Sequence, residues 1–262
     1  MTERTQGLTP RRVLRGAARR VPRAPFRYVM PAWLVRRPFR FWLSVVAADP
    51  DRRRAVRELL ELEAETRRQL DAAAIRLDDG VHAKHRLTAY HDFFVERVRP
   101  GERVLDVGSG KGELAHDLVV RAGAEVVGID NDPHHLAFAR DRFRHERLRF
   151  VEGTAPGDLP GERFDVIVLS NVLEHVDDRV ALLRSLVDSA RPRVVLVRVP
   201  VLARDWTVPL RRELGLDHFS DPGHFVEYDE EGFRAELGAA GLAITELQLV
   251  WGEIWAAAEP AA

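Results

Sequence analysis

One stretch decides the fold of this chain: VLDVGSGKGE, residues 104–113. An apolar run containing Asp106 is followed by glycines at the alternate positions 108, 110 and 112, and a helical pattern of apolar residues begins at Leu114. A buried parallel strand turns in this way into a helix whose N-terminus faces a ligand, because glycine lets the backbone approach that ligand closely. The stretch therefore predicts a strand–loop–helix unit with a ligand site at the loop.

The glycine spacing argues against a nicotinamide dinucleotide as that ligand. The dinucleotide fingerprint is G-x-G-x-x-G, with a pyrophosphate over the helix N-terminus. Here the spacing is G-x-G-x-G, and Glu113 stands where the third dinucleotide glycine belongs. A carboxylate at that position would repel a pyrophosphate, whereas Asp106, just before the loop, favours a ligand that carries positive charge.

The next apolar run, EVVGID at residues 125–130, predicts a second strand that ends in an acid. Asp130 lies about 20 residues beyond the glycines, where a carboxylate accepts hydrogen bonds from ribose hydroxyls. The alternative is a helix cap, since Asp130, Asn131 or Asp132 precedes Pro133. The acid therefore indicates a nucleoside rather than a particular reaction, and different residues can serve the two roles.

Two further runs complete an ordered series. LRFVEGTA at residues 148–155 predicts a third strand and its loop. FDVIVLSNVLEHV at residues 164–176 predicts a buried strand that is followed by a segment with polar residues at the edge of the sheet. Together the four segments resemble the motifs of class I S-adenosylmethionine (SAM)-dependent methyltransferases. That family often has Gly-Asp-Ala where this chain has Gly-Thr-Ala at 153–155, so the Thr154 hydroxyl or a backbone carbonyl is left to contact the adenine.

The resemblance implies an α/β fold: a Rossmann-like, doubly wound, mostly parallel seven-stranded sheet with an antiparallel C-terminal hairpin and an N-terminal helical lid. Alternating strand and helix patterns agree with a parallel sheet. We expect strands near 103–107, 125–129, 148–151, 164–169, 193–199, 243–250 and 252–257, and helices near 50–77, 85–98, 112–122, 133–144, 178–189 and 229–240.

Two domains are expected, an arginine-rich arm with a helical lid at 1–99 and a SAM-binding domain at 100–262, with an irregular acceptor-side insertion at 200–228. Residues 1–40 hold eleven arginines against one acid, Glu3. Such an arm suits phosphates, an acidic glycan or an anionic membrane surface, although a solvated leader is the favoured interpretation. The lid is expected to cover the pocket or to form a homodimer contact.

Ligands of open α/β sheets lie beyond the carboxyl ends of the strands. The resemblance implies that SAM is bound there and leaves as S-adenosylhomocysteine (SAH). The expected contacts are Asp106, Gly108, Ser109, Gly110, Asp130, Asn131, Gly153, Thr154, Ala155, Ser170 and Asn171.

The expected chemistry is a direct displacement at the SAM methyl group, in which the protein mainly aligns the acceptor and excludes water. A sugar hydroxyl is a poor nucleophile and needs a general base or a metal. The expected catalytic residues are His175, His224 and Glu174. His175, directly after Glu174, is the first candidate base and His224 the second, since histidine titrates near neutral pH. The alternative is that Glu174 and His175 only shape the pocket.

A magnesium ion held by Glu174, Asp177 and Asp178 is the less favoured alternative for activating the acceptor, because Mg²⁺ needs only one or two carboxylates plus other oxygens. Asp177 and Asp178 are more simply explained as caps of the helix that begins near Arg179.

The acceptor is harder to predict. The segments HAKHRLTAYHDFFVERV at 82–98 and VWGEIWA at 250–256 resemble bacterial methyltransferases of glycan and sugar metabolism, which implies O-methylation of a saccharide hydroxyl, for example on a mannoside or another oligosaccharide. The alternatives are another small metabolite, a quinone or lipid nucleus, or a partner subunit that binds SAM without catalysis. The intact glycine loop, with Asp106 and Asp130, argues against the last.

Composition agrees with one enzyme of ordinary globular character. The 262 residues include no cysteine, which excludes disulfides and thiolate metal ligands. No apolar run approaches the ~20 residues needed to span a bilayer, and no signal peptide is recognised. We therefore expect a cytoplasmic protein whose partner is a small-molecule or oligosaccharide acceptor and not a nucleic acid.

Overall fold

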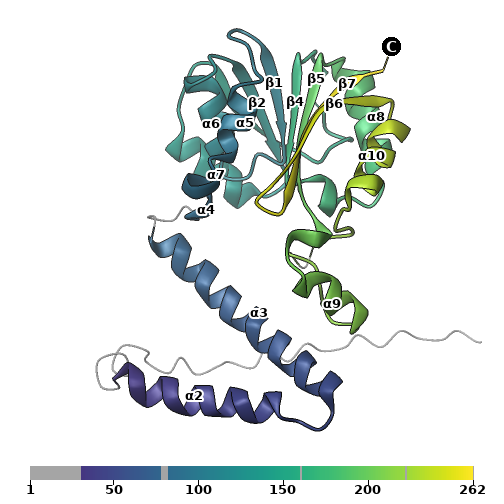
Figure 1. Ribbon diagram of the computed structural model, residues 1–262. Helices are drawn as coiled ribbons and strands as arrows, with labels where there is room; N and C mark the ends of the chain where they lie inside the picture. The colour runs from purple at the N-terminus through teal and green to yellow at the C-terminus, as the bar shows by residue number, and fades with distance from the viewer. Residues whose placement is uncertain (1–30, 78–81, 160, 222, 262) are drawn as a thin grey trace, which may run out of the picture. The chain divides into compact units, whose positions relative to one another are not determined.

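The computed structural model describes residues 31–77, 82–159, 161–221 and 223–261 (Figure 1). The chain forms two compact units, the first ending at Leu59 and the second running from Leu60 to Ala262. The first unit contains α2 (Ala32–Ala47) and the start of α3 (Arg52–Leu77). The expectation for the arginine-rich arm lies outside the described residues for positions 1–30, while Arg36, Arg37 and Arg40 lie on α2.

The second unit is built on one seven-stranded sheet with the strand order β3-β2-β1-β4-β5-β7-β6. Its strands are β1 (Arg103–Val107), β2 (Glu125–Asp130), β3 (Leu148–Glu152), β4 (Val166–Ser170), β5 (Val194–Pro200), β6 (Leu242–Val250) and β7 (Glu253–Pro260). The first five strands pair in parallel, and β7 pairs antiparallel with both β5 and β6. The predicted Rossmann-like sheet with an antiparallel C-terminal hairpin is confirmed.

Helices cover both faces of this sheet (Figure 1). On one face lie α5 (Tyr90–Val95), α6 (Glu113–Val120) and α7 (Pro133–Arg142), and on the other lie α8 (Arg179–Ala190) and α10 (Glu230–Ala239). Neighbouring residues of the central strands therefore face opposite cores: Val104 packs toward α5 and α6, and Leu105 packs toward α8. A strand buried on both faces has no polar alternation, which is why these strands read as continuous apolar runs.

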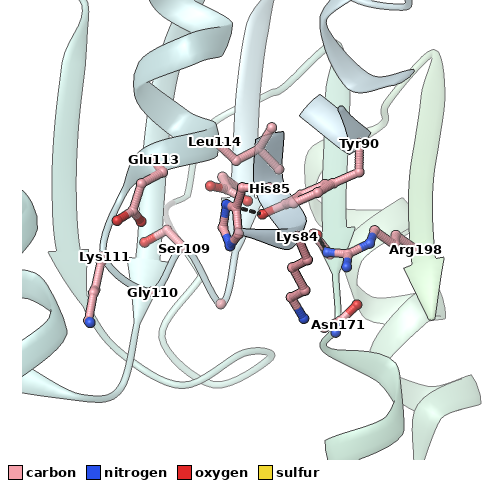
Figure 2. A pocket seen from close by; sticks show the side chains of 13 residues that line it. Lys84, His85, Tyr90, Ser109, Gly110, Lys111, Glu113, Leu114, Asn171 and Arg198 are labelled. Carbon is pink, nitrogen blue, oxygen red and sulfur yellow. Dashed lines mark hydrogen bonds between the residues drawn. The ribbon is translucent and has the colours of Figure 1, made fainter. Parts of the chain in front are cut away.

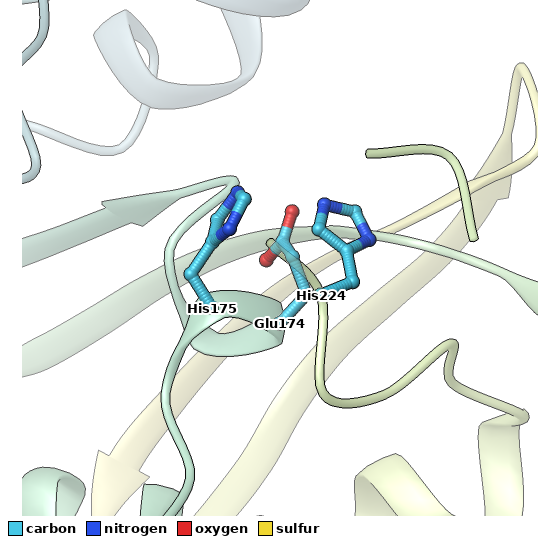
Figure 3. Close-up of side chains that lie close together, drawn as sticks. All are labelled: Glu174, His175 and His224. Atoms are coloured by element: carbon cyan, nitrogen blue, oxygen red, sulfur yellow. The ribbon is translucent and has the colours of Figure 1, made fainter. Parts of the chain in front are cut away.

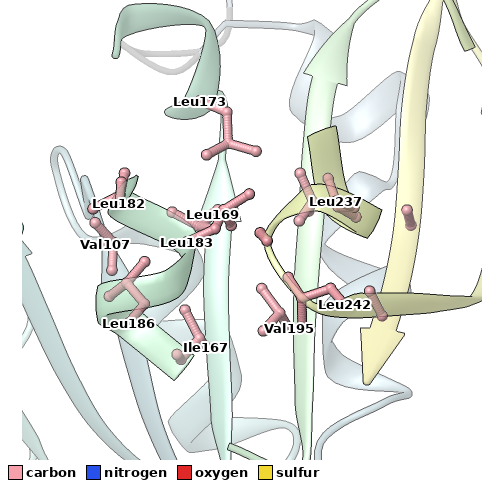
Figure 4. Close-up of a cluster of buried hydrophobic side chains, with 14 of the residues drawn as sticks. Val107, Ile167, Leu169, Leu173, Leu182, Leu183, Leu186, Val195, Leu237 and Leu242 are labelled. Atoms are coloured by element: carbon pink, nitrogen blue, oxygen red, sulfur yellow. The ribbon is translucent and has the colours of Figure 1, made fainter. Parts of the chain in front are cut away.

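The core beside α8 positions the end of β4. Leu182, Leu183 and Leu186 of α8 and Leu237 of α10 pack around Ile167, Leu169 and Val195 (Figure 4). The helix itself begins at a cap, since Asp178 Oδ1 accepts a hydrogen bond of 3.0 Å from Ala181 N. The capping interpretation of Asp178 is confirmed, and that carboxylate is therefore engaged by the helix.

The predicted irregular insertion contains a 3-10 turn, η2 (Leu202–Arg204), and a helix, α9 (Thr207–Glu213). The prediction missed α9 because the helix has only seven residues, too few to show a helical period, and because it contains Pro209. Proline is tolerated in the first turn of a helix, where the backbone N–H has no partner within the helix.

Within the part of the chain that the structure describes, no helix combines the length and the apolar character that crossing a membrane requires.

Candidate functional site

The loop between β1 and α6 presents bare backbone at the carboxyl end of the sheet. Gly108 N and Ser109 N donate hydrogen bonds of 2.8 and 3.0 Å to Ile129 O, which ties the loop to the end of β2. Gly108 has φ +68°, and a Cβ on it would lie 2.7 Å from Val172 Cγ2. Gly110 has φ +54° and faces open space. A side chain at Gly108 would thus be strained and would collide, and Gly110 leaves room for a ligand.

A cavity of about 230 Å³ opens beside this loop (Figure 2). The β1–α6 segment and the end of β4 form part of its wall, and residues 84–90 together with β5 form the rest. The structure brings together six of the residues predicted to contact the cofactor, namely Asp106, Gly108, Ser109, Gly110, Ser170 and Asn171. The other lining residues are Lys84, His85, Tyr90, Lys111, Glu113, Leu114 and Arg198.

Asp106 is the most unusual group in this wall. The residue is 2% exposed, and Oδ2 has no hydrogen-bond partner among the described residues. Burial, together with the charge of Asp130, raises the pKa of Asp106 to about 8. Buried polar atoms normally have a partner, so a cationic ligand group would satisfy this one. Ser109 Oγ and Asn171 Oδ1 are also buried and unpartnered in the described structure. The wall therefore fits SAM, which carries an ammonium and a sulfonium.

Asp130 ends β2 but serves the two loops around it. Its Oδ2 accepts a hydrogen bond of 2.8 Å from Gly110 N, and its Oδ1 accepts one of 2.8 Å from Asp132 N. Asp132 in turn caps α7 by accepting from His134 N. The carboxylate thus shapes the glycine loop, and a ribose contact for Asp130 stays a prediction.

The remaining predicted cofactor residues follow β2 and β3 and do not line the described cavity. Asn131 and Thr154 are exposed, and Ala155 packs against the apolar core. Gly153 N donates to Asp130 O at 3.0 Å, so the two strand ends lie next to each other. An adenine contact from residues 153–155 stays a prediction.

The sequence analysis did not predict that Arg198 lines the cavity. Arg198 lies on β5, is 3% exposed, and makes two hydrogen bonds of 2.6 Å to the Glu253 carboxylate on β7. Its guanidinium lies 3.8 Å from the centroid of the Tyr90 ring. One signal was present in the sequence: an arginine inside the apolar run VVLVRVP must be buried and therefore needs a partner.

Residues 84–90 contribute two basic side chains, Lys84 and His85, to the wall of the cavity (Figure 2). Burial, followed by the charges of His91 and Lys84, lowers the pKa of His85 to about 4, so its ring is neutral near pH 7. His85 Nδ1 lies 3.2 Å from the Tyr90 hydroxyl. Burial, with the Arg198 charge, also lowers the pKa of Lys84. Positive groups at this end of the cavity suit an anionic part of a ligand.

A second cluster lies on the turn that follows β4. Glu174 and His175 belong to η1 (Leu173–His175), and His224 comes from the loop before α10 (Figure 3). One potential ligand atom of each side chain lies within 4.8 Å of those of the other two. Glu174 is fully buried, and burial raises its pKa to about 7. The three predicted catalytic residues are thus brought together, while their roles stay predictions.

This chain resembles a known protein family and individual members of it. The family model of the methyltransferase domain matches residues 80–247. The ubiquinone biosynthesis O-methyltransferase of Azorhizobium caulinodans is 32% identical over 167 residues, which cover 60% of this chain and 65% of that protein. The ribosomal protein L11 methyltransferase of Deinococcus radiodurans is 34% identical over 166 residues, which cover 60% and 58%. The match thus spans less than two thirds of either relative.

Solved structures share the fold at low sequence identity. A SAM-dependent methyltransferase from Aquifex aeolicus aligns with a TM-score of 0.55 and 17% identity, over 73% of this chain and 98% of that one. The magnesium protoporphyrin IX methyltransferase of Synechocystis PCC 6803, solved with bound SAH, aligns with a TM-score of 0.52 and 21% identity, over 66% and 83%.

Proposed function

Because the chain belongs to the family of SAM-dependent methyltransferases, we propose that it transfers a methyl group to a hydroxyl oxygen of a small-molecule acceptor. The observation that carries the proposal is the buried, unpartnered Asp106 carboxylate beside the bare glycine loop. A carboxylate in that position favours the ammonium of SAM over the pyrophosphate of a dinucleotide, since like charges repel.

The residues of the wall have separable tasks. Asp106 binds the positive end of the cofactor, and the Gly110 backbone leaves space for it. Lys84 offers positive charge to a carboxylate, and Arg198 is held in the wall by its ion pair with Glu253. When bound, SAM supplies a methyl group on a sulfonium, which is a good leaving group. The remaining work of the chain is to align the acceptor and to exclude water.

The acceptor class is proposed from the relatives. Those named for ubiquinone biosynthesis favour a phenolic hydroxyl of a quinone-like nucleus as the first class. The saccharide hydroxyl expected from the likeness to glycan enzymes is the second, and neither of the two curated relatives described above is named for a saccharide. Trp206 and Phe225 are exposed aromatics on the acceptor-side insertion at 200–228, and Trp251 is exposed on the turn between β6 and β7. Each would stack on either kind of ring.

The cofactor is tested by thermal shift. SAM and SAH are expected to raise the melting temperature of the purified protein because they bind only the folded state, and NAD is expected to leave it unchanged. An equal shift with NAD, or none with SAM, would overturn the assignment of the cavity.

The acceptor is tested with methyl-labelled SAM and two panels, catechols and hydroxylated benzoquinols in one and mannosides in the other. Label in a methyl ether of either panel supports O-methylation and names the class. Label that enters only amines or protein would contradict the proposal. The cytoplasmic location and the homodimer stay predictions.

A further inference from the structure

The cluster on the turn after β4 contains a buried carboxyl group without a hydrogen-bond partner among the described residues. Glu174 is 0% exposed, and neither Oε1 nor Oε2 has a hydrogen-bond partner among the described residues. A buried carboxylate with no partner is costly. His175 and His224 lie close to it (Figure 3), and their rings contact each other edge to face, with centroids 4.5 Å apart and planes at 84°. The arrangement is one carboxyl group beside two imidazoles.

His224 faces this carboxylate in a fixed orientation. Its Nδ1 lies 3.1 Å from Glu227 Oε1, and both side chains are almost fully buried, at 3% and 1% exposed. A proton on Nδ1 donates to Glu227, which leaves Nε2 with a free lone pair. Because Nε2 then carries no proton, it cannot donate a hydrogen bond to the Glu174 carboxylate. Its lone pair can instead bind a cation together with that carboxylate. A carboxylate that orients a metal-binding histidine in this way is common at metal centres.

The scaffold holds these groups in place. Glu227 Oε1 also accepts hydrogen bonds from Ser220 N at 2.6 Å and Ser220 Oγ at 3.0 Å, and its other oxygen accepts from Arg204 Nη1. Phe225 N donates to Glu174 O at 2.7 Å, which joins the loop of His224 to the turn of Glu174. Both ligand-bearing segments are therefore tied together without any metal.

We propose that Glu174, His175 and His224 hold a divalent transition-metal ion whose open coordination positions take the hydroxyl oxygen of the acceptor. Two imidazoles and one carboxylate suit Mn²⁺, Fe²⁺, Co²⁺ or Zn²⁺, whereas Mg²⁺ prefers a shell of oxygens. This assignment differs from the magnesium set of Glu174, Asp177 and Asp178, in which Asp178 is already engaged as the cap of α8. It also gives the two histidines a role other than general base.

The acceptor part of the inference rests on the proposed function. The end of β4 connects the two sites, since Ser170 and Asn171 line the cavity and Glu174 follows in the next turn. A hydroxyl bound to a divalent metal loses its proton more readily. In the transfer the acceptor oxygen forms the new C–O bond, the C–S bond breaks with its electron pair remaining on sulfur, and the hydroxyl proton passes to water.

The test measures metal binding by the full chain in the absence of SAM and acceptor. The protein is stripped with a chelator and titrated with Co²⁺, Zn²⁺, Mn²⁺ and Mg²⁺ by calorimetry, with the Co²⁺ absorption spectrum as a second readout. One equivalent of transition metal is expected, bound at least 10-fold more tightly than Mg²⁺. Stoichiometric Mg²⁺ binding alone, or no binding of any of these metals, would overturn the inference.

Variants locate the site. Glu174→Gln and His175→Gln are expected to weaken Co²⁺ binding at least 10-fold, and Glu227→Gln is expected to weaken it about 10- to 100-fold by releasing His224. The matched control is Asp177→Asn, which is expected to bind Co²⁺ as the parent does. Since His175 is exposed, its variant keeps the inference testable if Glu174→Gln fails to fold. Equal binding by His175→Gln and the parent would contradict the assignment.

The two proposals fail separately. A protein that shows the SAM thermal shift but binds no transition metal loses only the metal site. A protein that binds the metal but shows no shift with SAM loses the proposed function and keeps the metal site.

Discussion

Asp106 is a single residue whose protonation is coupled to ligand binding. Burial and the charge of Asp130 raise the pKa of this carboxyl to about 8 in the folded chain, against an ordinary value of 3.8. The folded state therefore binds the proton more tightly than the unfolded state. The contribution of this protonated group to the free energy of unfolding is fully present below about pH 4. It is lost as the pH rises toward 8, where the buried group must ionise. Its ionised form has no partner in the described structure until a cation binds.

Binding of SAM near pH 7 is therefore expected to release a proton from Asp106, because the ammonium favours the carboxylate. Asp106→Asn is expected to abolish that release and to weaken SAM binding about 10- to 100-fold, since a hydrogen bond to a charged group contributes about 1.5–3 kcal/mol. Calorimetry in buffers of different ionisation enthalpy measures both quantities. Asp188→Asn, at an exposed position on α8, is the control. Unchanged proton release in Asp106→Asn would refute the role.

At the scale of elements, the β5–β7 pair joins the parallel part of the sheet to its C-terminal hairpin. Arg198 on β5 and Glu253 on β7 form a buried bidentate ion pair, and Trp255 Nε1 donates to Glu253 Oε2 at 2.9 Å. Because Arg198 also lines the cavity, the pair holds a wall of the site as well as two strands.

Glu253→Gln is expected to lower the free energy of unfolding by about 3–5 kcal/mol, because it leaves the Arg198 charge buried without its partner. Chemical denaturation at pH 7 measures the change. Glu230→Gln breaks a half-exposed ion pair with Arg234 on α10 and is expected to cost less than about 1 kcal/mol. Similar losses of unfolding free energy in the two variants would show that burial does not set the contribution of the Arg198–Glu253 pair to stability.

At the scale of the whole molecule, the described functional groups belong to one of the two compact units. The cavity is lined by residues between Lys84 and Arg198, and the second cluster ends at His224, all within the unit that begins at Leu60. The arm and lid at 1–99 were expected to form a domain separate from the SAM-binding part. Lys84, His85 and Tyr90 are nevertheless part of the cavity wall, and a lid function for the preceding residues stays a prediction.

Removal of residues 1–48, which leaves α3 complete, is expected to preserve the SAM thermal shift and Co²⁺ binding, because none of the described residues that line the cavity or form the Glu174 cluster is removed. The truncated and full-length chains are compared by thermal shift and calorimetry. Loss of the SAM shift in a truncated chain that remains folded by circular dichroism would show that the first unit takes part in cofactor binding.

Local pattern was enough to predict the individual strands, the glycine loop and the position of Asp106 before it, since apolar runs and glycine spacing act over a few residues. The seven-stranded sheet with its antiparallel hairpin was predicted from the resemblance to a known family. The short helix α9 was invisible because it spans too few residues to show a period. Only the tertiary structure decided that Arg198 lies in the cavity wall, that Asp130 holds the Gly110 loop, and that His224 stands beside Glu174. The physical reason is that each of these contacts joins residues far apart in the chain, and their meeting depends on how strands and crossovers pack rather than on the residues next to them.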